Sequence, residues 1–135
     1  MKKLVLLMMP LMVALLAACS AMDQLDSAVE EINENCPQHI EMGLTLTKAC
    51  RTNTELVYMY TVDESVLGED IIPNIHLTED LIRQEMKSTI RRDSEMRELA
   101  KVLAEHNMSL VQEYKGSISG KTARIVITAS DLRAL

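Results

Sequence analysis

The sequence predicts an α+β domain with the order helix-β-β-helix-β-β, in which a four-stranded antiparallel sheet has its helices packed on one face. Three observations support this prediction: an apolar stripe with helical spacing after residue 20, two pairs of strand-forming segments, and a long helical region between the pairs. The chain has 135 residues, of which 47% are hydrophobic, so it can build one domain around a core of mainly aliphatic side chains.

The first helix is predicted over about residues 22–35. Its apolar positions repeat every three or four residues, as one buried helix face requires, at Leu25, Val29, Ile32 and Cys36. Pro37 cannot continue a helix and restricts the residue before it, so the helix is expected to stop at Cys36. Cys36 therefore lies in phase with the buried face, at the C-terminal end of the helix.

Two antiparallel hairpins are predicted. Residues 43–51 (GLTLTKACR) alternate leucine with threonine, and residues 55–62 (ELVYMYTV) are rich in strand formers, with a polar turn between them. The second pair is formed by residues 109–116 and 121–128, joined by the loop SISG.

The two hairpins share a short sequence similarity. LVYMY at residues 56–60 and LVQEY at residues 110–114 agree at three of five positions. This match favours two related halves that contribute to one four-stranded antiparallel sheet.

The region between the hairpins contains a linker and a long helix. Residues 63–77 contain Gly and Pro and are predicted to be a linker. Thr78 is expected to cap a helix that extends to about residue 106, with a kink or a break at the polar sequence RRDSE and a charged face exposed to solvent. Asn107 can close this helix, and Ser130 is expected to cap a final helical turn.

Residues 1–18 have the features of a cleaved signal peptide: two lysines, then an apolar stretch too short for a comfortable membrane span. The sequence LAAC at residues 16–19 resembles the lipobox of bacterial lipoproteins. This resemblance implies lipidation of the Cys19 thiol and cleavage before it, which leaves residues 19–135 as a single domain on a short tether. Ser20 after the cysteine resembles outer-membrane sorting. We therefore expect a lipid-anchored envelope protein of the outer membrane that faces the periplasm.

The composition excludes several classes of ligand. The net charge is −6, and it becomes more negative when a leader with two lysines is removed, which argues against nucleic acid as a partner. The chain has three Tyr and no Trp or Phe, so stacking platforms for bases, sugars or flavins are scarce. We expect no cofactor. The expected partners are the membrane, through the lipid anchor, and another envelope protein.

The segments INENCP, LVYMYTVDE and LVQEYKGSISGKTARIVITASDL carry a resemblance to a known family. They are similar to a small secreted or lipid-anchored domain of Gram-negative bacteria, notably the Bacteroides group, and the similarity runs from about Ile32 to Leu132. The function of this family is unknown. The resemblance therefore implies the fold and the envelope location, and it implies no catalytic residues.

Cys36 has four candidate roles, of which two stay open. Catalysis is disfavoured because a thiol at a helix C-terminus lacks the electrostatic help that lowers its pKa at an N-terminus. The Cys-x-x-His spacing to His39 lacks the further paired ligands of a zinc site, so no metal site is predicted. The open roles are a buried thiol and a possible disulfide with Cys50, which an oxidising compartment permits.

No acid/base pair or phosphate-binding loop is recognisable, so the sequence predicts no catalytic residues and no enzyme. The leading hypothesis is a lipid-anchored, non-catalytic binding or scaffold domain. The alternative is an inhibitor or immunity-like protein that inserts the loop SISGK, residues 117–121, into the cleft of a periplasmic hydrolase.

Overall fold

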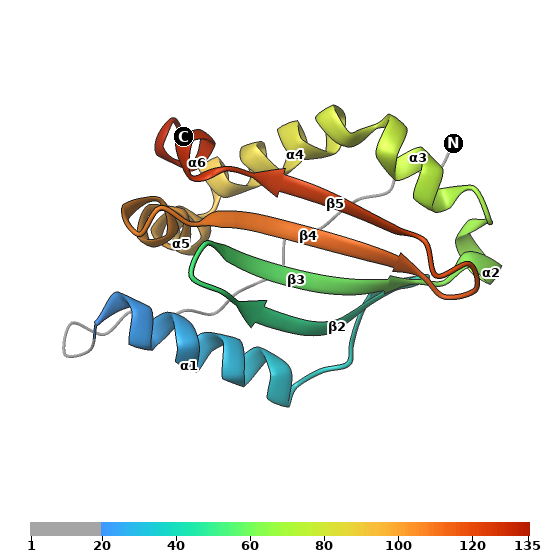
Figure 1. Ribbon diagram of the computed structural model, residues 1–135, viewed down its shortest axis with the longest axis horizontal. Coiled ribbons are helices and arrows are strands. Elements are labelled where there is room, and N and C mark those ends of the chain that lie inside the picture. Colours follow the sequence, from blue (N-terminus) through green and yellow to red (C-terminus); the bar gives the residue numbers. More distant parts are fainter. Residues whose placement is uncertain (1–19) are drawn as a thin grey trace.

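Five strands form one mixed sheet whose spatial order follows the sequence, β1-β2-β3-β4-β5 (Figure 1). The computed structural model describes residues 20–135, and the predicted leader, with its lipobox-like sequence and Cys19, lies outside the described residues. The strands are β1 (Gln38–Glu41), β2 (Leu44–Arg51), β3 (Glu55–Val62), β4 (Ser109–Gly116) and β5 (Thr122–Ile127). The α+β class and both predicted hairpins are confirmed.

The prediction of four antiparallel strands is wrong on two points. The four-residue strand β1 adds a fifth strand at the edge, where it pairs with the start of β2. The central strands β3 and β4 are parallel, whereas every other neighbouring pair is antiparallel. The reason is the helical connection after β3, which returns the chain to the end of the sheet at which β3 begins, so that β4 starts in the same direction.

The two similar segments of the sequence lie side by side in this parallel pair. Leu56 pairs with Leu110, Val57 with Val111 and Tyr60 with Tyr114, so the identical residues occupy equivalent positions on adjacent strands. The similarity therefore marks neighbouring central strands of the sheet.

The described chain contains six helices: α1 (Ala21–Glu34), α2 (Glu64–Leu67), α3 (Ile71–Leu77), α4 (Glu79–Arg92), α5 (Ser94–Glu105) and α6 (Ala129–Arg133). Helices α3 and α4 lie on the β5 side of the sheet, and α1 lies on the β2 side (Figure 1). No helix in this part of the chain combines the length and apolar character that a membrane crossing needs.

Helix α1 matches its prediction closely and covers an open sheet edge. Ser20 accepts a hydrogen bond from the Asp23 backbone N–H and caps the helix. Near its other end, the Asn33 carboxamide accepts from the Ala49 N–H and donates to the Ala49 carbonyl, each at 2.8 Å. Because β1 pairs only with the first residues of β2, Asn33 replaces the missing strand partner along the rest of that edge.

The segments predicted as linker and as long helix need corrections. Residues 64–67 and 71–77 are helical and not a linker. Helix α4 does begin after Thr78, but the Thr78 hydroxyl donates to the Asn74 carbonyl and makes no N-cap bond. The final helix is capped by Thr128 and not by Ser130.

The predicted break within RRDSE occurs at Asp93. Its backbone ends α4, and its carboxylate accepts hydrogen bonds from the Glu95 and Met96 N–H groups at the start of α5. The predicted left-handed residue that follows α5 is confirmed, because Asn107 has a φ of 57°.

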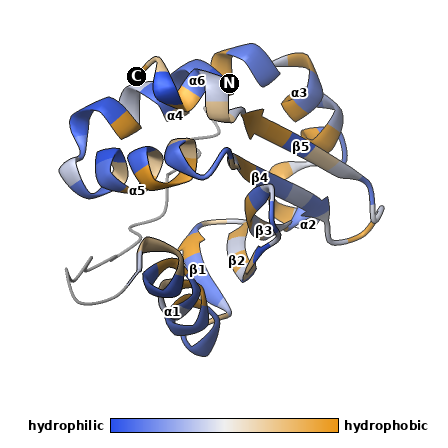
Figure 2. Cartoon of the chain, turned by 60° about the vertical axis from the view of Figure 1, so that its left-hand side comes forward, coloured by the Kyte–Doolittle hydropathy of each residue, from blue (hydrophilic) through white to orange (hydrophobic). Residues whose placement is uncertain are grey.

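One core fills the space between the sheet and the helices. Alternating residues of β3 point into it, together with apolar residues from α1, α3, α4, α5 and α6. Figure 2 shows hydrophilic residues on the outer sides of α1 and α4, whereas β5 is mostly hydrophobic. All three tyrosines are buried in this core, and the rings of Tyr60 and Tyr114 stack with centroids 5.2 Å apart.

Candidate functional site

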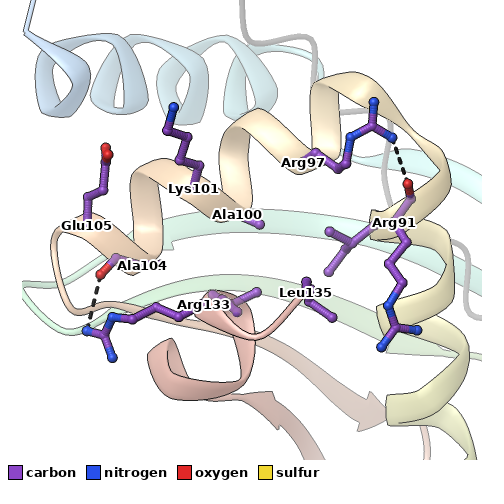
Figure 3. Close-up of a pocket in the computed structure, with 10 residues that line it drawn as sticks. Arg91, Arg97, Ala100, Lys101, Ala104, Glu105, Arg133 and Leu135 are labelled. Carbon is purple, nitrogen blue, oxygen red and sulfur yellow. Dashed lines mark hydrogen bonds between the residues drawn. The ribbon is translucent and has the colours of Figure 1, made fainter.

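Helices α4, α5 and α6 enclose a surface groove of about 460 Å³ (Figure 3). This volume lies within the range of pockets that hold ligands. The break at Asp93 positions the walls, because it turns α5 away from α4 and opens a space that α6 closes from the C-terminal side. The lining residues are Ile90, Arg91, Arg97, Ala100, Lys101, Ala104, Glu105, Leu132, Arg133 and Leu135.

The floor of the groove is apolar. Ala100 and Ala104 lie one turn apart on α5, and their small side chains leave room for another chain to approach the helix closely. Ile90, Leu132 and Leu135 complete the floor from α4 and the C-terminal segment. Apart from the half-buried Leu135, these side chains belong to the core, so the floor is a rigid outer boundary of the packed interior.

The rim of the groove is cationic. Four basic side chains surround it, and Glu105 is the one acid among the lining residues. Arg97 donates to the Arg91 carbonyl at 2.6 Å, and Arg133 donates to the Ala104 carbonyl at 3.3 Å (Figure 3). Arg133 also donates to the Asn107 side-chain oxygen at 2.8 Å, so two of the guanidinium groups are held in place. Within residues 20–135, the Arg91 and Lys101 side chains have no ion-pair or hydrogen-bond partner.

The chemistry of the groove is that of binding. An apolar floor with a cationic rim can hold an anionic, partly apolar ligand, since burial of apolar surface and charge pairing act together. The groove has no histidine, cysteine or hydroxyl side chain that could act as a nucleophile or base. In the part of the chain described, no three His, Cys, Asp or Glu side chains gather as metal ligands.

The sequence pattern did not predict the groove. It indicated a solvated face for the charged residues of this helical region, which is the usual position of such residues. The charge pattern gave no signal for the groove, because residues 91–98, which flank the break, contain three basic and three acidic side chains. Only the fold brings α6 against α5, so spacing along the chain did not show that these residues meet.

The β4–β5 loop is organised around a buried carboxylate. The Glu64 side chain is 2% exposed and accepts hydrogen bonds from the Ser119 N–H at 2.7 Å, the Ser119 hydroxyl at 2.8 Å and the Ile118 N–H at 2.7 Å. These donors, from Ser119 first, hold the pKa of Glu64 below its ordinary value. The loop amides are thus occupied internally, which agrees with the absence of a phosphate-loop spacing. Ile118, at 67% exposure, projects outward from the loop.

The structure contains Cys36 and Cys50 as free, half-buried thiols. Cys36 packs against the core, as its position in the apolar stripe predicts. Cys50 pairs with Val57, and the alternation of β3 places these two residues on the sheet face opposite to Tyr58. This placement on opposite faces favours two free thiols, and the disulfide stays an untested prediction. Burial raises the pKa of the Cys36 thiol, which weakens its nucleophilic character.

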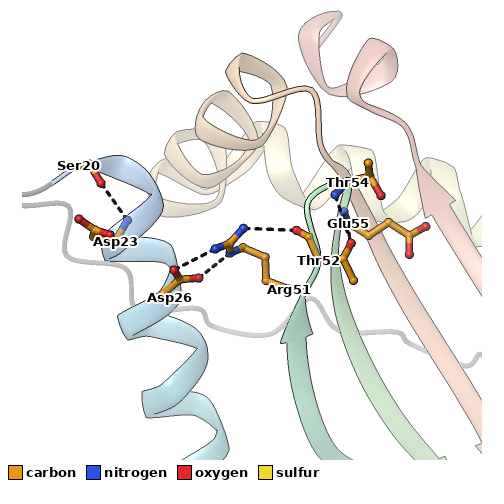
Figure 4. Close-up of polar contacts among 7 residues, drawn as sticks. All are labelled: Ser20, Asp23, Asp26, Arg51, Thr52, Thr54 and Glu55. Atoms are coloured by element: carbon orange, nitrogen blue, oxygen red, sulfur yellow. Dashed lines mark hydrogen bonds and ion pairs between the residues drawn. The ribbon is translucent and has the colours of Figure 1, made fainter.

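The N-terminal end of α1 is fixed to the sheet (Figure 4). Arg51 at the end of β2 binds the Asp26 carboxylate through two nitrogens, at 2.5 and 2.9 Å, in a bidentate ion pair. The hydrogen bond from Arg51 holds the pKa of Asp26 below its ordinary value. The turn that follows β2 is closed by the Thr52 hydroxyl, which accepts from the Thr54 and Glu55 N–H groups. Helix α1 is therefore an integral part of the domain from its first turn.

No protein-family model matches this sequence, and no curated protein matches it. Solved structures share its fold at low sequence identity. A candidate secreted protein from Pseudomonas aeruginosa is 13% identical, with a TM-score of 0.63 over 82% of this chain and 91% of that chain. The type 2 secretion system pilotin of Vibrio vulnificus is 11% identical, with a TM-score of 0.54 over 78% of this chain and 86% of that chain. The type II secretion system pilotin of Vibrio cholerae is 11% identical, with a TM-score of 0.50 over 78% and 85% of the two chains. The chain is thus similar in fold to small α+β proteins that include two secretion pilotins.

Proposed function

We propose that this chain is a non-catalytic, lipid-anchored binding domain of the cell envelope that docks another envelope protein in the groove between α4, α5 and α6. The observation that carries the proposal is the groove itself, with its apolar floor and its cations at Arg91 and Lys101 that have no partner in the described chain. A rigid floor and a set of available charges are the features of a recognition site, and the lining residues include no histidine, cysteine or hydroxyl side chain.

The lipid anchor is the second part of the proposal. Lipidation of Cys19 would place the acyl chains directly before Ser20, which caps α1. Because Arg51 and Asn33 fix α1 to β2, the domain would sit close to the membrane surface with little freedom to turn. The outer membrane, with the domain in the periplasm, remains the proposed location, based on the serine after the cysteine.

The fold comparison supports a role in an envelope assembly. Two of the structures with a similar fold are pilotins of a type 2 secretion system. We extend this to a pilotin-like role, in which the chain binds a protein component of an envelope machine and carries no enzymatic activity. The proposal rests on the groove, and the fold similarity indicates the class of partner to look for.

In-cell crosslinking of the mature lipoprotein, followed by mass spectrometry, tests this function. We expect repeated recovery of the same envelope protein, and loss of that recovery when Cys19→Ser removes the lipid site. A matched Cys50→Ser variant keeps the predicted anchor and should recover the partner as wild type does. Repeated experiments that recover no envelope protein would sink the proposal.

The inhibitor or immunity-like function remains the second candidate, and one observation favours it. The β4–β5 loop is held rigid by Glu64, and it presents the exposed side chain of Ile118 at its tip, as an inserting loop would. Ile118→Asp should then raise the sensitivity of cells to the periplasmic hydrolase concerned. Unchanged sensitivity to a panel of periplasmic hydrolases would exclude this function.

A further inference from the structure

We propose that the occupant of the groove is an acidic amphipathic segment of the partner protein, whose apolar side chains cover the floor and whose carboxylates pair with the rim. This inference rests on the proposed function and specifies the chemistry of the partner. It is carried by the charge of the groove, which is opposite to the charge of the whole protein.

The charge contrast is large for a chain of this size. The protein has a net charge of −6, yet the groove brings four basic side chains around a single acid, Glu105. An acidic segment is therefore repelled by the net charge of the protein and attracted by the local charge of the groove. Such a pattern favours one orientation of the bound segment, because like charges that meet elsewhere cost free energy.

The rim groups have the geometry for carboxylates. The guanidinium of Arg133 is held by the Ala104 carbonyl and by Asn107, and that of Arg97 is held by the Arg91 carbonyl. These bonds use only one nitrogen of each guanidinium, so further N–H groups stay available for a bidentate carboxylate. Arg91 and Lys101 are exposed and add two more cations along the same rim.

The floor indicates that the segment is also apolar. Ala100, Ala104 and Leu132 line the groove, and a purely acidic chain would leave their surface in contact with water. A lipid head group would pair with the cations but would likewise leave this floor uncovered. A peptide segment with leucine-like side chains between its acids satisfies both features, as in other amphipathic segments that bind grooves.

A photocrosslinker at the groove tests the inference in cells. Benzoylphenylalanine in place of Glu105 removes the one acid and keeps all four cations, and the same group in place of Lys115 on β4 reports a surface away from the groove. We expect the Glu105 position to capture a partner peptide with more Asp and Glu than Lys and Arg and with interspersed apolar residues. A neutral or basic peptide at this position would overturn the inference and leave the envelope-binding function standing.

Charge reversal gives the quantitative test. Arg91→Glu combined with Lys101→Glu should lower capture at least about tenfold, since it turns attraction into repulsion. The control pair, Lys48→Glu with Lys115→Glu, changes the net charge equally at exposed positions on the strands and should retain capture. Reversal of the captured partner acids to lysine should restore binding to the Arg91/Lys101 double variant. Equal capture by both double variants, or no restoration, would refute the pairing.

Three further outcomes distinguish a failure of this inference from a failure of the proposed function. Capture only from the Lys115 position would show that a partner binds outside the groove, against the inference. No capture from either position would count against the proposed function itself. Co-sedimentation with phosphatidylglycerol vesicles that is lost in the Arg91/Lys101 variant, without any captured peptide, would assign the rim to lipid head groups and overturn the inference.

Discussion

Three tyrosines lie on one face of the sheet, and the hydrogen bonding of their hydroxyls predicts how the fold responds to the loss of each hydroxyl. Tyr58, Tyr60 and Tyr114 are each at most 2% exposed. The Tyr114 hydroxyl donates to the side-chain oxygen of Gln112, whereas those of Tyr58 and Tyr60 have no hydrogen-bond partner among the described residues. We predict that Tyr114→Phe destabilises the protein and that Tyr58→Phe and Tyr60→Phe do not.

The magnitudes follow from the environment of each hydroxyl. Removal of the Tyr114 hydroxyl breaks a buried hydrogen bond and should cost about 1–2 kcal/mol of unfolding free energy. A buried hydroxyl without a partner is itself unfavourable by about 1–3 kcal/mol, so its removal should be neutral or should stabilise by up to that amount. Phenylalanine keeps the stacked ring pair of Tyr60 and Tyr114, so the ring contact does not contribute to the difference. Tyr114→Phe and Tyr60→Phe should therefore differ in unfolding free energy by about 1–5 kcal/mol.

Urea unfolding followed by far-ultraviolet circular dichroism measures these differences. This signal is suitable because the chain has no Trp and each substitution removes a fluorescent tyrosine. Equal slopes of unfolding free energy against urea are needed for the comparison. Similar costs for all three substitutions would refute the reasoning, as would a larger loss for Tyr60→Phe than for Tyr114→Phe. Either result would mean that the hydroxyls are paired in solution.

Four further predictions concern pH, the loop and the cysteines. Burial raises the pKa of all three tyrosines above the ordinary value of 10.0. Their contribution to the free energy of unfolding is therefore complete below about pH 10 and is lost as the pH rises further. Tyrosinate absorbance should appear together with unfolding, and its appearance in the folded protein would contradict this prediction. Hydrogen bonds hold the pKa of Glu64 below its ordinary value of 4.5. The contribution of Glu64 to the free energy of unfolding is therefore present above that pH and is lost as the pH falls through the lowered pKa. Glu64→Gln should show a smaller loss of unfolding free energy between pH 7 and acid than wild type does. A Cβ at Gly116 would lie 2.5 Å from the Glu64 carboxyl carbon. Gly116→Ala should therefore cost about 1–3 kcal/mol of unfolding free energy, and it should cost less in a Glu64→Ala background. Urea unfolding can measure both costs. Alkylation of the denatured mature protein without reductant should modify both Cys36 and Cys50, whereas two cysteines that are alkylated only after reduction would show that the disulfide exists.

The local elements were predictable from the sequence because each follows a short-range rule. The stripe from Leu25 to Cys36 gave α1 within about one residue at each end, and β2 and β3 followed from their strand formers. Asn107 was identified because few residues adopt its left-handed conformation. In each case the signal lies within a few residues of the feature that it predicts.

The sheet topology was not predictable in this way. Strand β4 runs parallel or antiparallel to β3 according to the end of the sheet at which α5 ends. The position of that helix end depends on helix packing over some 45 residues. The strand β1 was missed because QHIE has no alternating apolar pattern, and the pairing with β2 decides its conformation. The carboxylate of Glu64 was missed for a similar reason, since its three donors are more than 50 residues away in the sequence.

The groove and the β4–β5 loop, the two candidate binding surfaces, lie at different distances from α1. The turn at Thr52–Glu55 and the start of β4 lie at the end of the sheet where α1 begins, because the Ser109 N–H donates to the Thr54 carbonyl and Arg51 binds Asp26. The β4–β5 loop with Ile118 lies at the other end, roughly 25 Å away along strands of eight residues. If Cys19 carries the lipid, as we propose, the loop points away from the membrane, whereas the groove on α5 leads back toward the anchored end.

With a lipid on Cys19, as we propose, this arrangement would link the anchor to the groove mechanically. Helix α1 cannot swing freely, because Asn33 completes the edge of β2 and Asp26 is paired with Arg51 at the other end of the same helix. The groove is built on the same core that α1 covers, so with the proposed anchor its distance from the membrane and its direction would be set by the fold and not by a flexible linker. A partner segment held there would be presented at a fixed height above the lipid surface. A short tether is thus an advantage for a domain that positions a partner, and it would be a handicap for one that has to search for substrates across the periplasm.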